Sequence, residues 1–238
     1  MATKRIIADQ DFEQLIIRTH RGMRNVTMRV KPDGLYLTVP PFSKTAEVLK
    51  ILEPYRLALL EKYEEIRSRP IDLNFHIDAP CFKLSLRQGT LSFFSIRFEE
   101  EQVTIFCPYN VDFAQEDIQR LVRNAIVRAL KKRAEEYLLP LLQTLADQYH
   151  FIYRKVRIKA VKSRWGSCSA AGSINLSCYL LLLPPHLMDY VLLHELCHTK
   201  EMNHGPKFWK LLDDVTSGMA RALRKELRHY RADFPLSS

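Results

Sequence analysis

The chain has 238 residues, 47% of them hydrophobic and 26% charged, with 7 glycines and 12 prolines. This composition is typical of a globular protein and excludes collagen-like, low-complexity and wholly disordered chains. Apolar runs fall short of the roughly 18–20 residues of a membrane-spanning helix, and the first residues lack the apolar core of a signal peptide. Five cysteines, an odd number, do not suit full disulfide pairing, so we expect a cytoplasmic protein without a membrane partner.

Charge is distributed unevenly along the chain. Lys and Arg number 36 against 27 Asp and Glu, which gives a net charge of +9. Residues 151–238 hold 14 basic and 7 acidic residues, whereas residues 71–150 hold 9 and 11. A basic surplus permits contact with nucleic acid or acidic partners, but it is also common on ordinary protein surfaces.

The first part of the chain is predicted to form strands followed by a helix. Residues 14–30 and Leu35–Val39 alternate as strands do, and a Pro-Asp-Gly turn joins them. Ser43 is placed to cap a helix that Pro54 must end or kink, and the helical pattern resumes over residues 55–66.

A second unit with the same order of elements follows. Strands are expected at residues 84–86, 91–98 and 103–106. Asp112, with Gln115 three residues later, is predicted to open a long helix in a capping-box pattern. The two units match in element order and only loosely in residues, so an internal strand–helix repeat stays open.

That long helix is predicted to reach about Tyr149, with an interruption at Pro140. Its apolar positions mark one face, and much of the rest is basic: Arg120, Arg123, Arg128, Lys131, Lys132 and Arg133. We interpret these residues as a solvated face rather than as a stripe that binds nucleic acid.

The next segment predicts a hairpin and then a helix. Residues 156–160 alternate as a strand, and residues 174–180 form a second strand that we pair with the first. Pro184 and Pro185 stop this strand and start a helix, because proline at a first helical position loses no hydrogen bond.

This helix contains the motif that carries chemistry, His194-Glu195-Leu196-Cys197-His198. Residues four apart lie on nearly the same face of a helix, so both imidazoles can reach one metal ion. Glu195 lies about 100° round the helix, where it can hold a metal-bound water without being a ligand. Two structural histidines are the alternative, but the apolar residues before them would leave buried imidazoles without partners.

His204 supplies a third imidazole six residues after His198. The helix must end before His204 for this side chain to return to the same ion, and Asn203 and Gly205 allow a turn there. Pro206 then fits the start of a new helix. Three imidazoles and a water are typical of an open, catalytic zinc site, while Cys197 is interpreted as a core residue.

These segments resemble the YgjP-like metallopeptidases, relatives of the SprT-like and WLM zincins. The resemblance lies in the motif itself, in Asn-His-Gly-x-x-Phe-Trp, in Arg-Trp-Gly-Ser-Cys-Ser and in Pro-Pro-x-x-x-Asp-Tyr-Val. It implies an α+β, zincin-like fold in which a hairpin of residues 164–169 and 174–180 borders the cleft. It also implies that His194, His198 and His204 are the Zn²⁺ ligands and that Glu195 is the catalytic glutamate.

The sequence therefore predicts a zinc peptidase acting on a peptide or protein substrate, which could lie extended along an edge strand. Glu195 takes a proton from water and delivers it to the departing amine. Candidates for an oxyanion donor or a substrate contact are Arg164, Tyr179, His186 and Tyr190.

Two other functions stay open. Nucleic-acid association is one, because SprT-like relatives act on DNA-bound protein and a basic helix is predicted over residues 219–230. A zinc-binding module without turnover is the other, although Glu195 disfavours it. We expect a strand-rich region over residues 1–110 and a zincin-like domain over residues 111–238. The basic surplus then surrounds the active site and becomes a clue to the charge of the substrate.

Overall fold

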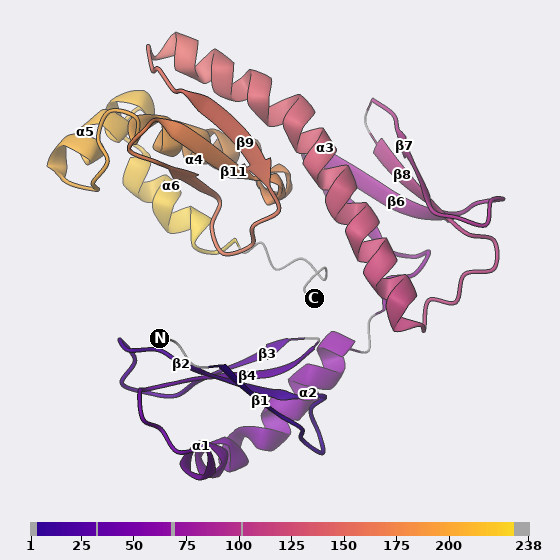
Figure 1. Cartoon of the computed structure of the whole chain (residues 1–238). Coiled ribbons are helices and arrows are strands. Elements are labelled where there is room, and N and C mark those ends of the chain that lie inside the picture. The colour runs from indigo at the N-terminus through magenta and orange to yellow at the C-terminus, as the bar shows by residue number, and fades with distance from the viewer. Residues whose placement is uncertain (1–3, 32, 68–69, 101, 231–238) are drawn as a thin grey trace. The chain divides into compact units, whose positions relative to one another are not determined.

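The computed structural model describes residues 4–31, 33–67, 70–100 and 102–230. They form two compact units, one within residues 1–70 and one within residues 71–233 (Figure 1). The architecture is mixed α+β with three small sheets, which confirms the predicted class. The boundary expected near residue 110, between a strand-rich region and a zincin-like domain, stays a prediction.

The first unit is a four-stranded sheet with helices packed on it. Its order is β1-β2-β4-β3, in which β2 and β4 are parallel and the outer pairs are antiparallel. Alternate side chains of β2 and β4 pack on Val48, Leu52 and Tyr63 to form the core. The elements are β1 (Lys4–Ile7), β2 (Leu15–Thr19), β3 (Thr27–Lys31), β4 (Gly34–Val39), α1 (Thr45–Leu52) and α2 (Arg56–Arg67).

The second unit begins with a sheet of the same topology. Its order is β5-β6-β8-β7, again with one central parallel pair flanked by antiparallel pairs. The strands are β5 (His76–Ala79), β6 (Phe82–Gln88), β7 (Ser95–Phe98) and β8 (Gln102–Cys107). The repeat left open by the sequence is therefore present in strand order and direction, including β1 and β5, which the sequence pattern missed.

Both predicted helix caps are wrong. The Ser43 hydroxyl donates to the Pro40 carbonyl (2.9 Å), and α1 begins one residue later than a Ser43 cap would require. The Asp112 carboxylate accepts the Ala114 N–H (3.0 Å), and the following helix begins only at Glu116. In both cases the short polar side chain satisfies a neighbouring turn before the helix starts. The break at Pro54 is confirmed as a single 3₁₀ turn between α1 and α2.

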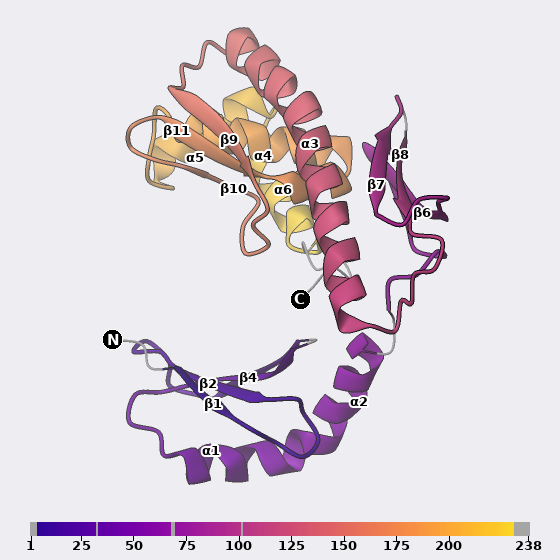
Figure 2. The ribbon, with the colours of Figure 1, turned by 45° about the vertical axis from the view of Figure 1, so that its right-hand side comes forward.

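The long helix α3 (Glu116–Gln148) runs through Pro140, so the predicted interruption is wrong. Pro140 is exposed, where water can satisfy the carbonyl that loses its helical partner. Figures 1 and 2 both show α3 between the β5–β8 sheet and the later elements of the unit, which follow α3 in the chain. α3 contacts the sheet on one side and these later elements on the other. Its buried residues, including Val122, Ile126 and Leu130, build this interior.

The third sheet has the order β10-β11-β9, formed by β9 (Lys155–Lys159), β10 (Gly166–Cys168) and β11 (Ser173–Ser177). β10 and β11 form the antiparallel hairpin that the family resemblance implied. β9 pairs with β11 in parallel, so the hairpin predicted between those two strands is wrong. Alternation identified the strands, but it carries no information on the direction of pairing.

The 3₁₀ turn η2 (Cys178–Leu182) leads into three helices: α4 (Pro185–Cys197), α5 (Pro206–Val215) and α6 (Ala220–Leu227). The predicted starts of α4 and α5 are confirmed. All five cysteines are free, and Cys197 is buried as expected. Over the residues that the structure describes, no helix combines the length and hydropathy needed to cross a membrane.

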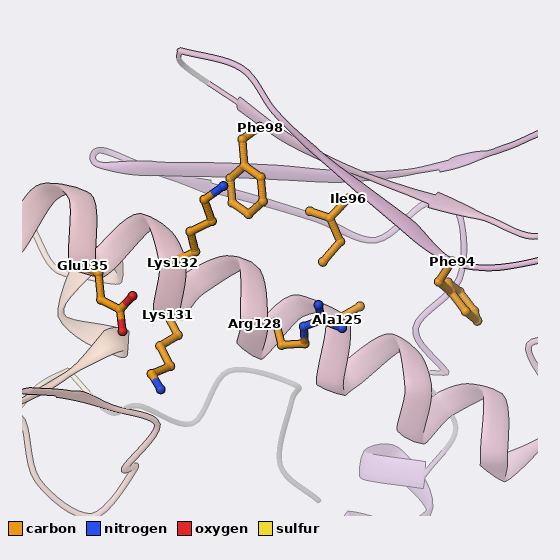
Figure 3. A pocket seen from close by; sticks show the side chains of 8 residues that line it. All are labelled: Phe94, Ile96, Phe98, Ala125, Arg128, Lys131, Lys132 and Glu135. Atoms are coloured by element: carbon orange, nitrogen blue, oxygen red, sulfur yellow. The ribbon is translucent and has the colours of Figure 1, made fainter.

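A groove of about 560 Å³ lies between β7 and α3 (Figure 3). Phe94, Ile96 and Phe98 line it from the sheet, and Lys132 and Glu135 are among the residues that line it from the helix. The Lys132 Nζ lies 4.0 Å from the centre of the Phe98 ring, so this ammonium group is engaged in a cation–π contact.

Gln119 ties the start of the second unit to α3. Its amide accepts the Ile71 N–H (2.9 Å) and donates to the carbonyls of Ile71 (2.9 Å) and Phe113 (2.8 Å). Gln119→Leu leaves these backbone groups unpaired, and we expect it to lower the free energy of unfolding by about 2–4 kcal/mol in urea titrations. Gln148→Leu, at the exposed end of the same helix, is the control and should cost less than about 0.5 kcal/mol. Equal losses in the two variants would contradict this role.

Candidate metal centre

α4 and the turn after it position three histidines. His194 and His198 lie one helical turn apart, and α4 ends at Cys197, whose carbonyl accepts the Glu201 N–H (2.9 Å). The predicted end of the helix before His204 is therefore confirmed. The chain returns without the left-handed residue that Asn203 or Gly205 could have provided, since Gly205 is extended with φ −79°.

The three imidazoles converge through their Nε2 atoms. The Nε2 of His194 lies 3.2 Å from that of His198 and 3.1 Å from that of His204. Tetrahedral zinc with bonds of 2.0–2.1 Å to nitrogen would separate its ligand atoms by about 3.3 Å, so these distances fit a single ion. His198 is buried and His204 is exposed, which leaves one side of the cluster open to solvent.

At His194 and His198 the surroundings favour the neutral imidazole, which is the form that binds metal. Burial, with smaller contributions from His198, His204 and Arg224, lowers the pKa of His194 to about 3. Burial also lowers the pKa of His198. The Nδ1 of His198 lies 3.0 Å from the Glu201 carbonyl, so an Nδ1–H tautomer would donate there and turn the Nε2 lone pair toward the cluster.

Phe208, on α5, is the shared support of the cluster. Its fully buried ring contacts His194, His198 and His204 at centroid distances of 5.0, 4.6 and 4.7 Å. The next residue, Trp209, donates its indole N–H to the His204 carbonyl (3.1 Å). α5 therefore fixes both the packing of the rings and the backbone that carries the third imidazole.

Glu195 lies beside the cluster and is buried, with 5% of its surface exposed. Burial raises its pKa to about 7, against the opposing charge of Arg164. Its Oε2 and the Nδ1 of His194 are buried without a hydrogen-bond partner in the described part of the chain. Three convergent imidazoles next to an unpartnered carboxylate oxygen fit a divalent metal that keeps an exchangeable ligand.

Gly166 on β10 packs closely against the Glu195 side chain. A Cβ added at Gly166 would lie 2.6 Å from the Oε1 of Glu195 and 2.7 Å from its Cγ, closer than side chains tolerate. The strand thus approaches Glu195 to a distance that only glycine permits. The sequence marked this glycine only as part of a family segment, because the approach comes from tertiary packing.

The four candidate donors lie in different surroundings. The Tyr190 ring is 5.9 Å from that of His194 but is buried, and the exposed Arg164 acts on the pKa of Glu195. Tyr179 is buried in η2, and the Nε2 of His186 lies 2.8 Å from the Glu226 carboxylate. Their roles in binding or catalysis stay predictions.

Residues 24–230 match the family model described as YgjP-like, metallopeptidase domain. The chain belongs to this family. The crystal structure of the metallopeptidase zymogen of Pyrococcus abyssi abylysin is also similar, with 28% identity over 38% of this chain and 90% of that chain and a TM-score of 0.35. No curated protein matches significantly. The family model confirms the predicted resemblance and makes this YgjP-like protein a peptidase, whose substrates are peptides or proteins.

Gly166→Ala tests the support of Glu195. The added methyl group must displace the Glu195 side chain, so we expect kcat/KM for peptide hydrolysis to fall by about 10–100-fold. Metal content should stay unchanged, because the substitution does not touch the histidines. Gly205→Ala is the matched control, since its Cβ would meet nothing within 4 Å. An unchanged kcat/KM in Gly166→Ala, measured on the metal-loaded enzyme, would show that the close approach has no catalytic consequence.

Trp209→Phe tests how α5 holds the third imidazole. Phenylalanine keeps an aromatic ring but removes the N–H that fixes the His204 carbonyl, so we expect Zn²⁺ affinity to fall by about tenfold in competition with a chromophoric chelator. Trp165→Phe serves as the control for loss of an indole elsewhere in the unit. Equal affinity in wild type and Trp209→Phe would contradict the proposed support.

Proposed function

We propose that this YgjP-like protein is a zinc-dependent peptidase of the zincin type, with His194, His198 and His204 as ligands and Glu195 as general base. The observation that carries the proposal is the meeting of three imidazole nitrogens beside one buried carboxylate whose Oε2 has no hydrogen-bond partner among the described residues. Imidazole ligands with an open position favour zinc over other divalent metals.

Bound zinc would supply Lewis acidity and lower the pKa of a water molecule. The chain's own contribution is the placement of Glu195, whose free Oε2 accepts the proton of the attacking water and returns it to the leaving amine nitrogen. A base with a pKa of about 7 can both accept and release that proton near neutral pH. Gly166 keeps the carboxylate in place and shields it from bulk water on the side of β10.

The substrate would lie extended along β10, which is an edge strand of its sheet over the described residues. Arg164 is the best placed of the four candidates to contact the substrate or a developing oxyanion, because it is exposed and lies just before this strand. The five free thiols support a reducing compartment such as the cytoplasm.

The two alternatives receive less support. Arg221 and Arg224 of α6, part of the basic C-terminal segment, each lie 5.1 Å from the Trp209 ring and therefore take part in packing near the centre. Nucleic-acid binding by this helix would have to compete with those contacts. A zinc module without turnover has no use for a carboxylate that is buried without a hydrogen-bond partner at its Oε2.

Glu195→Gln is the direct test of the mechanism. Glutamine preserves the size of the side chain but cannot accept the proton, so we expect zinc to remain bound while cleavage of a mixed peptide library falls by at least about 10³-fold. Glu201→Gln, whose side chain lies outside the cluster contacts, should keep near-normal activity. Retained cleavage in Glu195→Gln, measured by mass spectrometry, would refute the role of Glu195.

A further inference from the structure

The segment before the metal centre is unusually one-sided in charge. Between Gln148 and Met188 the chain has six Lys and Arg residues and no Asp or Glu. They are Arg154, Lys155, Arg157, Lys159, Lys162 and Arg164. The segment spans the whole third sheet, so its charge belongs to the same structure that borders Glu195.

The register of the third sheet places much of this charge on one face. Ser173, Asn175 and Ser177 of β11 pair with Lys155, Arg157 and Lys159 of β9, so each pair points to the same side. Ser167 of β10 pairs with Asn175 and joins this face. The opposite face carries Ile158, Ile174 and Leu176, all buried. One side of the sheet is thus apolar and the other is polar and basic.

A pocket of about 240 Å³ opens at one end of this sheet. Its charged lining residues are Lys159 and Arg164, and its polar ones include Ser167, Asn175 and Ser177. Within the described part of the chain, no acidic residue lines it. Lys159 and Arg164 are both exposed, and neither forms an ion pair with a described residue. The pocket therefore presents two cations and several hydrogen-bonding groups without an internal counter-charge.

The pocket lies next to the Glu195 carboxylate, and β10 separates the two. Gly166 lines the pocket, and its α-hydrogen side faces Glu195. Arg164 also lines the pocket, and its charge reaches Glu195. Side chains of an extended peptide alternate between the two sides of a sheet. A substrate paired with β10 (Figure 2) would direct one side chain toward the metal centre and its neighbours toward the basic face.

We propose that this pocket binds the carboxylate of an Asp or Glu side chain of the peptide substrate, between Lys159 and Arg164, and so selects acidic substrates. This inference rests on the proposed peptidase function, and it adds the class of substrate. The guanidinium of Arg164 offers a paired donor geometry that matches a carboxylate, and Lys159 adds a second charge.

An acidic peptide fits this face better than a nucleic acid does. Single-stranded nucleic acids bind where several aromatic rings stack on successive bases. Among the lining residues of this pocket Trp165 alone is aromatic, and the outward residues of β9 and β11 are Lys, Arg, Ser and Asn. The groove of Figure 3 is less suited to the same ligand, because Glu135 lines it and Lys132 already covers the Phe98 ring. Charge complementarity therefore favours the pocket beside β10.

The test uses pairs of quenched fluorescent peptides that differ by Glu or Gln at one position, walked along a sequence that the zinc-loaded enzyme cleaves. We expect wild type to prefer Glu at one position by about tenfold in kcat/KM, as a charge-assisted contact would give. Lys159→Gln and Arg164→Gln should each reduce this ratio by about threefold, and rising salt should reduce it in wild type. Lys155→Gln, on the same strand and face but outside the pocket, is the matched control and should leave the ratio unchanged.

Binding separates this proposal from the peptidase mechanism. Fluorescence anisotropy of labelled Glu and Gln peptides on zinc-loaded Glu195→Gln should show the same preference, and adding Lys159→Gln should reduce this preference by about threefold. If wild type cleaves no peptide but this binding preference is observed, the proposed peptidase function is refuted and the binding of an acidic side chain in the pocket is supported. Equal kcat/KM for Glu and Gln at every position would overturn the pocket and leave the peptidase intact. Tighter binding of oligothymidylate than of acidic peptide, lost in Lys159→Gln, would also overturn it.

Discussion

The second unit is organised around the cost of bringing three imidazole nitrogens within 4.8 Å of one another, with the Nε2 of His194 3.2 Å from that of His198 and 3.1 Å from that of His204. Protonated rings at these distances repel, and burial lowers the pKa of His194 and His198, which favours their neutral forms. Phe208 provides that environment, because one apolar ring packs against all three imidazoles. A single helix face supplies only two ligands, so the end of α4 and the early start of α5 are both needed to return His204.

The position of Glu195 depends on a second element, the short strand β10. A carboxylate buried next to neutral imidazoles would ordinarily seek a hydrogen bond or a cation. Here the backbone of Gly166 packs against it instead, and the nearest cation, Arg164, is exposed and opposes the rise in pKa only in part. The strand therefore restricts the side chain without neutralising it, and the Oε2 has no hydrogen-bond partner among the described residues.

The sequence predicted that the three histidines come together, but it did not predict features that depend on packing between distant segments. Helical spacing is local, so His194 and His198 could be placed on one face, and the Asn-His-Gly-x-x-Phe-Trp segment placed His204 near them. The parallel pairing of β9 with β11 could not be predicted, since the intervening β10 forms the hairpin instead. The role of Gly166 could not be predicted either, because it depends on the distance between a strand and a helix 29 positions along the chain. Ser43 and Asp112 are residue types that commonly cap helices, but here their side chains form hydrogen bonds with backbone groups of neighbouring turns.

The third sheet also connects the charge of the chain to its chemistry. Successive side chains of a strand point to opposite faces of a sheet, so one face can be apolar and pack against the protein interior while the other face stays polar. In this protein the buried face carries Ile174 and Leu176, and the outward face carries Lys155, Arg157 and Lys159 from a segment of the sequence without Asp or Glu. A net charge of +9 spread evenly would act only through long-range attraction, which salt screens within about 10 Å. Concentrated beside β10, the same charge lies next to Gly166 and Glu195, so under the proposed function one strand would serve both recognition and cleavage.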